Sequence, residues 1–292
     1  MATEIRALIE EGAARLRRAT DAPRREAEVL LADALGRSRT WLLANAGERV
    51  LDCDATDRYE SHVTRRASGE PVAYILGEKE FWSMTLAVTR DVLVPRPETE
   101  LVVERALAHL AEGGARRVLD LATGSGAIAL AIARERPACR VLGSDVSGTA
   151  IALATANAQR LGIANARLET GTWYEPARDE LFDVITCNPP YVAGGDVGLA
   201  WQVRRHEPYR ALYAGPTGLE ALHTVIAGAP ARLLPAGWLV LEHGSTQGEA
   251  VRALLAAAGF TEVSTFRDLA GHERCTEARR GTEGTLPFSG PG

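Results

Sequence analysis

The feature that most limits the fold of this chain is the regular alternation of helical and strand patterns after residue 98. Apolar residues at helical spacing predict helices over residues 98–111, 126–135, 148–161, 217–234 and 247–258. Between them, short runs of apolar and β-branched residues predict strands in the segments RRVLDLA, CRVLGSD, ARLET, FDVITC, GWLVLEH and FTEVSTFRD. Strands that alternate with helices in this way predict an α/β fold with a doubly wound, mostly parallel sheet.

The residues on either side of this alternation predict different structures. Residues 1–70 contain apolar residues at helical spacing, and the segments 38–45 and 54–69 each begin with a Ser or Asp that can cap a helix. Alternating β-branched and aromatic residues predict a hairpin after residue 70. We therefore expect a helical bundle domain at 1–70, a β-hairpin connector at 71–97, an α/β domain at 98–280 and a disordered tail at 281–292.

Composition and charge narrow the class of protein. With 38 acidic and 33 basic residues the net charge is −5, which disfavours direct nucleic-acid binding because proteins that bind polyanions usually carry a basic surplus. The four cysteines are scattered and the six histidines lack ligand spacing, so we expect reduced thiols and no metal. Acidic residues interrupt the N-terminal amphipathic segment and no apolar run reaches membrane-spanning length, so we expect a cytoplasmic protein without membrane contact.

A glycine-containing turn follows the first predicted strand of the α/β domain, in VLDLATGSGAIALAIA. Gly124 and Gly126 allow the backbone to approach a ligand closely at the start of the next helix. Together with Ala129 and with Asp145 at the end of the second strand, they fit a dinucleotide pattern, which favours NAD. Asp120 in the first strand instead favours S-adenosylmethionine, because a carboxylate repels a pyrophosphate but suits a sulfonium and an ammonium group. On this hypothesis Asp120 lies near the methionine end and Asp145 binds the ribose.

A second motif, Asn188-Pro189-Pro190-Tyr191, ends the predicted strand FDVITC. The oxygen of Asn188 and the carbonyl of Pro189 can each accept one N–H of a planar NH2 group. The two prolines have no N–H of their own and their φ angles are restricted, so they present carbonyls rigidly. Tyr191 can pack on the planar group. This combination is typical of methyl transfer to a planar nitrogen.

The motifs taken in order extend this interpretation to a family. The segments PVAYILGEKEFW, VLVPRPETE, ATGSG, NPPY, EPYRALYAGPTGLEAL, LVLEHG and DLAGHER together resemble the protein-(glutamine-N5) methyltransferases that modify peptide chain release factors. The likeness covers about residues 20–280. It implies a class I methyltransferase fold with an N-terminal helical domain for substrate-protein recognition and a seven-stranded sheet whose last strand is antiparallel. It also implies S-adenosylmethionine as methyl donor, class I release factors as substrates, and a monomer.

The resemblance also implies roles for particular residues. It places the cofactor at Asp120, Asp145, Trp173, Asn188 and the turn residues Ala122, Thr123, Gly124, Ser125 and Gly126, and it places catalysis at Asn188, Pro189, Pro190 and Tyr191. Arg96 and Glu98 are expected near the substrate with the NPPY residues, and Glu207 and Pro208 are candidates for the substrate channel. Family members usually have glycine where this chain has Ala122. Its methyl group is tolerated if φ is ordinary and weakens cofactor binding if φ is positive, and we expect a modest effect at most.

Three alternative functions remain open from the residues alone. A glutamine methyltransferase acting on a ribosomal protein shares the fold, the cofactor and NPPY. An N6-adenine nucleic-acid methyltransferase presents the same NH2 geometry to Asn188, although the net charge disfavours it. An NAD-binding oxidoreductase is supported only by the glycine turn and Asp145.

Overall fold

The computed structural model describes residues 3–196 and 198–282. The chain divides into two compact units: the first comprises Met1–Glu78 together with Leu199–Glu207, and the second comprises Lys79–Gly198 and Pro208–Gly292. No helix among the described residues is both long and apolar enough to cross a bilayer. Apart from residues 281 and 282, the tail predicted to be disordered lies outside the described residues.

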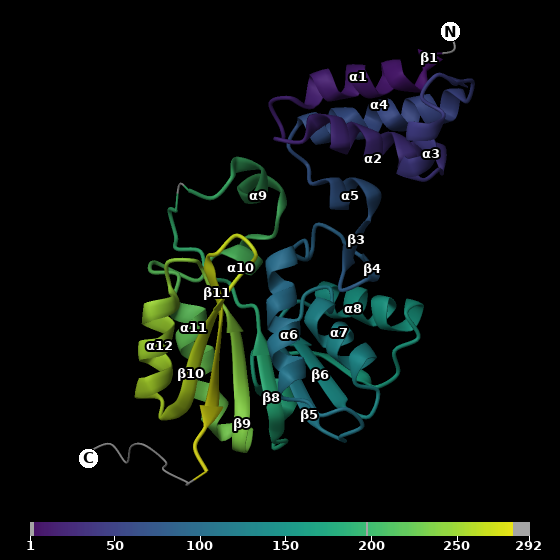
Figure 1. The fold of residues 1–292 in the computed structure, drawn as a ribbon. Helices are drawn as coiled ribbons and strands as arrows, with labels where there is room; N and C mark the ends of the chain where they lie inside the picture. Colours follow the sequence, from purple (N-terminus) through teal and green to yellow (C-terminus); the bar gives the residue numbers. More distant parts are fainter. Residues whose placement is uncertain (1–2, 197, 283–292) are drawn as a thin grey trace. The chain divides into compact units, whose positions relative to one another are not determined.

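The first unit is a helical bundle (Figure 1). Its helices are α1 (Ile5–Leu16), α2 (Pro23–Leu35), α3 (Arg39–Ala44), α4 (Cys53–Ala67), α5 (Val72–Leu76) and α9 (Trp201–His206), and β1 (Thr3–Glu4) pairs with β2 (Arg49–Val50). Leu8, Leu30, Leu31 and Val63 belong to one buried apolar cluster that lies between the helices. The four helices predicted before residue 70 are therefore present, held by the burial of their apolar faces.

Two local details of the first unit differ from the sequence prediction. Helix α4 is capped by Asp52, whose carboxylate accepts the Ala55 N–H at 3.1 Å, and not by Asp54. Residues 72–76, predicted as extended, form the short helix α5, which begins after Pro71 and ends at Gly77 with φ 76°. Pro before a helix and a left-handed Gly after it are boundary signals that outweigh the β-branched composition of this segment.

A segment from much later in the chain also belongs to the first unit. The Trp201 ring lies so close to Gly69 that a Cβ built there would be 2.4 Å from it. The Gln202 amide donates to the Ala19 carbonyl at 3.3 Å, and a ring nitrogen of His206 lies 3.3 Å from the Ser68 carbonyl. The residues that follow the NPPY motif by about ten positions are thus attached to the helical bundle.

The second unit contains a seven-stranded sheet in the order β10-β11-β9-β8-β5-β6-β7 (Figure 1). Its strands are β5 (Arg117–Leu121), β6 (Arg140–Asp145), β7 (Ala166–Thr170), β8 (Phe182–Cys187), β9 (Leu233–Glu242), β10 (Phe260–Arg267) and β11 (Glu273–Arg280). Strand β11 pairs antiparallel with both β9 and β10, whereas β7, β6, β5, β8 and β9 pair parallel in that order. The predicted doubly wound, mostly parallel sheet and the antiparallel last strand are confirmed.

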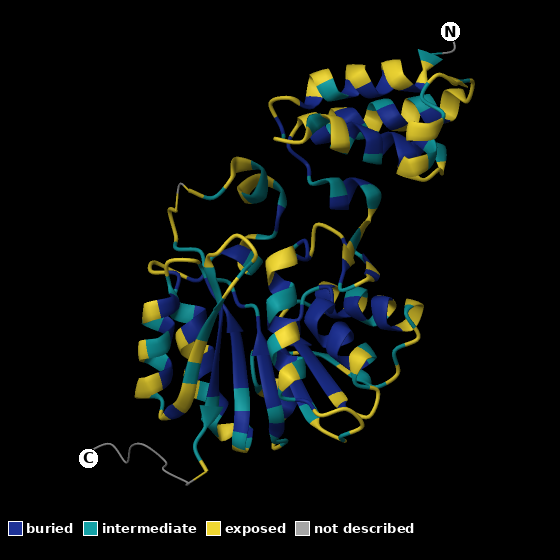
Figure 2. Cartoon of the chain, viewed as in Figure 1, coloured by how far each residue is buried: buried dark blue, intermediate teal, exposed yellow. Residues whose placement is uncertain are grey.

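Helices cover both faces of this sheet. They are α6 (Glu100–Ala108), α7 (Ala127–Glu135), α8 (Gly148–Arg160), α11 (Glu220–Gly228) and α12 (Gly248–Ala257). The second unit also contains the short helix α10 (Tyr209–Leu212) and 3₁₀ turns at Pro97–Thr99, Glu175–Ala177 and Ala229–Ala231. Successive strand residues point to opposite faces, so Val118 packs with α6 and α7 while Leu119 packs with α11 and α12. The central strands are buried (Figure 2). Burial on both faces explains their nearly continuous apolar sequences.

Two features of the second unit differ from the prediction. Strand β11 was not predicted from its residues. The helix predicted over 217–234 ends as α11 at Gly228, because β9 already begins at Leu233. Within the segment predicted as a hairpin connector, β3 (Glu78–Phe81) pairs with β4 (Met84–Ala87), and the intervening residues Trp82 and Ser83 both have positive φ, 50° and 53°.

Candidate active site

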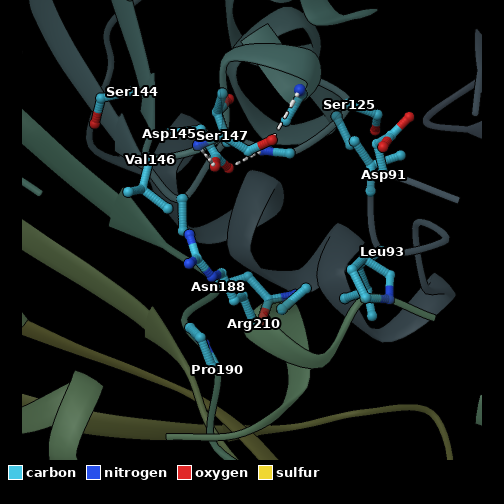
Figure 3. A pocket seen from close by; sticks show the side chains of 18 of the residues that line it. Asp91, Leu93, Ser125, Ser144, Asp145, Val146, Ser147, Asn188, Pro190 and Arg210 are labelled. Carbon is cyan, nitrogen blue, oxygen red and sulfur yellow. Dashed lines mark hydrogen bonds between the residues drawn. The ribbon is translucent and has the colours of Figure 1, made fainter. Parts of the chain in front are cut away.

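A cavity of about 680 Å³ opens at the carboxyl ends of the parallel strands of the second unit. Its wall is formed by the turns after β5, β6, β7 and β8, by residues 90–96 before α6, and by residues 208–213 around α10. Figure 3 shows residues of these segments directed around one space. This is the edge of an open α/β sheet at which ligands usually bind.

The glycine turn forms one side of the cavity. Gly124 has φ 55°, and a Cβ placed on it would meet no atom within 4 Å, so its backbone faces open space. Gly126 does not line the cavity; it begins α7 with φ 85°, and a Cβ there would lie 3.0 Å from Leu130 and 3.2 Å from Ala154. The two glycines therefore serve different purposes: Gly124 gives a ligand access to the backbone, and Gly126 allows close helix packing.

Ala122 lines the cavity in the left-handed region, with φ 54°. A methyl group in this region is strained by about 1–2 kcal/mol. The backbone here therefore meets the condition under which glycine is the favoured residue and under which the methyl group is expected to weaken cofactor binding.

Asp145 lies at the end of β6 and lines the cavity. One carboxylate oxygen accepts the Gly124 N–H and the other accepts the Ser147 N–H, both at 2.9 Å (Figure 3). Each oxygen retains a lone pair for a ligand. Asp145 thus ties the glycine turn to the second strand and presents remaining acceptor capacity to the cavity.

Asp120 does not line the cavity. Its side chain is completely buried within β5, and its two oxygens accept the hydroxyls of Thr123 at 2.6 Å and Thr186 at 2.8 Å. Burial raises the pKa of Asp120 to about 7, although these hydrogen bonds act in the opposite direction. Of the neighbouring turn residues, Thr123 and Ser125 do line the cavity. Asp120 therefore does not itself reach the cavity, whereas Thr123, which donates to it, does.

This position of Asp120 also changes the comparison with NAD. The electrostatic argument against a pyrophosphate assumed that the Asp120 carboxylate faces the glycine turn. In the structure it is covered by threonine hydroxyls, so that argument does not discriminate between the two cofactors.

Trp173 follows β7 and lines the cavity on the same side as Ser144. Its φ of 47° is unusual for an aromatic residue, and its carbonyl accepts the Ser144 hydroxyl at 3.1 Å. The hydrogen bond helps to hold the backbone in this conformation. The indole is partly buried against the core on the α11–α12 face of the sheet.

The NPPY motif follows β8, and its residues have different environments. Asn188 and Pro190 line the cavity, whereas Pro189 is buried and does not. Tyr191 is absent from the cavity wall as well; its hydroxyl donates to Glu242 Oε1 at 3.0 Å, and its carbonyl accepts the Gln247 amide at 3.0 Å. The motif is therefore anchored through Tyr191 and presents Asn188 to the cavity.

Two residues of the site were not predicted from the sequence, Thr99 and Glu242. The Asn188 amide nitrogen donates to Thr99 Oγ1 at 3.1 Å, and Thr99 Oγ1 donates to Glu242 Oε2 at 2.7 Å. Burial raises the pKa of Glu242, although hydrogen bonds from Thr99 and Tyr191 act in the opposite direction. The available sequence signal was the carboxylate that ends the apolar strand GWLVLEH, at the same sheet edge as Asn188.

Of the residues predicted to lie near the substrate, some line the cavity and others do not. Arg96 and Pro208 line the cavity, while Glu98 is exposed and does not. Glu207 is buried and is part of the first unit. Tyr209 and Arg210 of α10 also line the cavity, and they were not predicted as site residues, because their only sequence signal is their place in EPYRAL.

The chain is similar to known proteins in sequence and in fold. The "PrmC N-terminal domain" family matches residues 7–77, and the "Methyltransferase small domain" family matches residues 99–205. A solved 16S rRNA N2 G1207 methyltransferase of Thermus thermophilus has a TM-score of 0.53 at 20% identity, covering 70% of this chain and 49% of its own, which reflects the shared fold.

Two curated relatives are similar over most of both chains. The release factor glutamine methyltransferase of Bordetella pertussis is 50% identical over 254 residues, 86% of this chain and 93% of the relative. That of Xylella fastidiosa (strain Temecula1) is 47% identical over 254 residues, 87% of this chain and 92% of the relative. On this similarity the chain belongs to the release factor glutamine methyltransferase family.

Proposed function

We propose that this enzyme transfers a methyl group from S-adenosylmethionine to the side-chain amide nitrogen of the glutamine in the Gly-Gly-Gln motif of class I peptide chain release factors. The observation that carries the proposal is that Asn188, the candidate holder of an NH2 group, and Asp145, the candidate holder of a ribose, line the same cavity. The family to which the chain belongs supplies the class of reaction.

The residues around the cavity fit S-adenosylmethionine. Asp145 has acceptor capacity for ribose hydroxyls, Gly124 leaves the backbone open to the ligand, and Trp173 offers an aromatic surface for adenine. The cavity volume lies within the range of small-molecule sites, about 300–1,000 Å³. When bound, S-adenosylmethionine supplies a methyl group attached to a positively charged sulfur atom.

The chain's own residues then position the acceptor nitrogen. A glutamine amide nitrogen is a poor nucleophile because its lone pair is delocalised into the carbonyl. Asn188 Oδ1 accepts one N–H, which orients the nitrogen without a general base of shifted pKa. The Pro189 carbonyl is retained as the proposed acceptor of the other N–H, although Pro189 does not line the cavity in this structure. Alignment of this kind lowers a reaction barrier by several kcal/mol, up to about 7–11 in favourable cases. The amide proton leaves with or after the transfer, to water.

The remaining assignments are part of the same proposal. Arg96 lies in the cavity wall and is proposed to contact the substrate protein. Glu98 follows it closely in the sequence and is exposed, and it is retained as a candidate for the same role. The helical first unit is proposed to recognise the release factor, and the enzyme is proposed to act in the cytoplasm as a monomer, because release factors work on ribosomes there.

The decisive experiment supplies the purified enzyme with labelled S-adenosylmethionine and one acceptor at a time. The acceptors are a class I release factor, the same factor with its Gly-Gly-Gln glutamine replaced by alanine, ribosomal protein, and adenine-containing DNA. We expect label on the intact release factor alone. Label on the ribosomal protein instead would support the related glutamine methyltransferase activity, and label only on DNA would refute the proposal.

A further inference from the structure

A buried hydrogen-bonded chain connects the cavity residue Asn188 to the carboxylate of Glu242. Glu242 is the last residue of β9 and is 1% exposed. Its two oxygens each accept one hydroxyl, Thr99 at 2.7 Å and Tyr191 at 3.0 Å. Thr99, 4% exposed, in turn accepts the Asn188 amide N–H at 3.1 Å. This series of hydrogen bonds thus connects three segments that are far apart in the sequence.

We propose that Glu242 and Thr99 are positioning residues that determine which end of the Asn188 amide faces the methyl-accepting nitrogen. This inference rests on the proposed function, in which Asn188 must act as an acceptor. The amide oxygen and nitrogen are nearly equal in size, so packing does not choose between the two orientations of the side chain. Only the hydrogen bonds on one side of the amide can make that choice.

The direction of these hydrogen bonds follows from the ionised carboxylate. An ionised Glu242 has no proton to donate, so the single hydrogen of the Thr99 hydroxyl must point to it. The Thr99 oxygen then has only lone pairs left for Asn188, and only the Asn188 NH2 group can satisfy them. The Asn188 oxygen is consequently turned to the opposite side, where it is free to accept from a substrate NH2 group.

If the direction of these hydrogen bonds were reversed, Asn188 would present a donor to the substrate. If Glu242 carried a proton, it could donate to Thr99, and Thr99 could then donate to the Asn188 oxygen. The Asn188 NH2 group would face the substrate NH2 group, so two donors would meet and the acceptor nitrogen would lose its orientation. The polarity of Asn188 therefore depends on the charge of a residue that does not touch the cavity.

The groups around Glu242 determine the pH at which its carboxylate becomes protonated and loses its charge. Arg274 on β11 favours the ionised form, and Glu98 disfavours it. Further titratable groups near it among the described residues are Tyr191, Cys187 on β8, the adjacent His243, and Cys275, which pairs with Glu242 across β9 and β11. Burial raises the pKa of Glu242, so protonation begins at a less acidic pH than for an exposed glutamate.

The test compares Thr99→Val, which removes the hydroxyl while keeping the shape, with Thr99→Ser, which keeps the hydroxyl. Turnover of the release factor, its KM and the dissociation constant of S-adenosylmethionine are measured for both variants and the wild type. We expect Thr99→Val to lower kcat at least tenfold with cofactor affinity within threefold, and Thr99→Ser to stay within threefold of wild type. A uniform loss of cofactor binding in Thr99→Val, or equal kcat in the two variants, would overturn the inference while leaving the proposed function standing.

A second arm uses Glu242→Gln and the pH dependence of kcat. Wild-type kcat is expected to fall as acid protonates Glu242, whereas Glu242→Gln, which does not titrate, is expected to lack that inflection. An unchanged inflection in Glu242→Gln would overturn the inference, because a different group would then be titrating. If the wild type methylates no release factor at all, the proposed function fails first and the inference fails with it.

Discussion

At the scale of single residues, Asn188 has the strongest claim to a direct role. Its amide reaches the cavity while its nitrogen is held by Thr99. Replacing Asn188 with Ala removes the acceptor oxygen but leaves the glycine turn and Asp145 unchanged. We expect turnover of the release factor to fall at least 100-fold, with the dissociation constant of S-adenosylmethionine within a few fold of wild type. Turnover assays and calorimetric titration check this, and retained turnover would refute the assigned role.

Ala122 allows a second test at this scale. Its φ of 54° is strained for alanine, and glycine removes that strain at the expense of greater freedom in the unfolded chain, worth about 0.4–1 kcal/mol. We expect Ala122→Gly to raise the free energy of unfolding by about 0.5–1 kcal/mol net. We also expect tighter cofactor binding, by less than tenfold. Thermal unfolding and cofactor titration measure both quantities; a loss of stability would contradict the backbone argument.

At the scale of elements, the packing of α1 on α4 depends on one glycine. A Cβ on Gly12 would lie 2.0 Å from the hydroxyl of Tyr59, which donates to the Leu8 carbonyl at 3.0 Å. In Gly12→Ala the ring must move and lose this bond, and overpacking of this kind costs about 1–3 kcal/mol. The gain in helix propensity, about 0.5–1 kcal/mol, offsets only part of it.

The matched control for this substitution is Gly47→Ala in the same unit. A Cβ on Gly47 would meet nothing within 4 Å, and its φ is not in the left-handed region. We expect Gly12→Ala to lower the thermal midpoint of the helical unit and Gly47→Ala to leave it nearly unchanged, as followed by circular dichroism. Equal effects of the two substitutions would show that the Tyr59 contact is easily accommodated.

The strands of the sheet differ in whether they could be predicted from their own sequence. Strands β5, β6 and β8 lie where their apolar runs predicted them, because a strand buried on both faces must be apolar along its length. Strand β7 also lies in its predicted segment, although as an edge strand it is only partly buried. Strand β11 was missed because its sequence, ERCTEARR, is rich in charge. Its Glu277 is 4% exposed and is bound by Arg105 at 2.9 Å and 3.1 Å. That compensating partner is 172 positions away and could not be predicted locally.

At the scale of the whole molecule, Asp120 makes stability depend on pH. Its pKa is about 7 in the folded chain, against an ordinary value near 3.9. Between these values the folded chain binds a proton that the unfolded chain has lost, so this contribution to stability is complete below about pH 4 and is lost by about pH 7. The expected slope is about −1.4 kcal/mol per pH unit within that window.

Substitution of Asp120 by Asn removes this titration while keeping nearly the same shape. We expect the difference in unfolding free energy between wild type and Asp120→Asn to shift against the wild type as the pH rises from 5 to 8. Thermal or denaturant unfolding of both proteins at each pH measures the difference. A difference that does not change with pH would mean that Asp120 titrates normally in the folded chain.

The sequence by itself determined those features of the protein that depend on short, local sequence patterns. The alternation of strands and helices predicted the doubly wound sheet, and the positions of ATGSG and NPPY at strand ends predicted that they meet at one edge. These inferences hold because the hydrophobic periodicity of an element and the chemistry of a turn each depend on residues that are close together in the sequence.

Only the tertiary structure decided how the site residues face one another. It showed that Asp120 is buried under Thr123 and Thr186, that Ala122 has a positive φ, and that β11 lies between β9 and β10. It also connected Asn188 through Thr99 to Glu242, although Thr99 and Glu242 are separated by 143 positions. Burial and hydrogen-bond direction are properties of neighbours in space, and the order of residues along the chain does not specify them at this range.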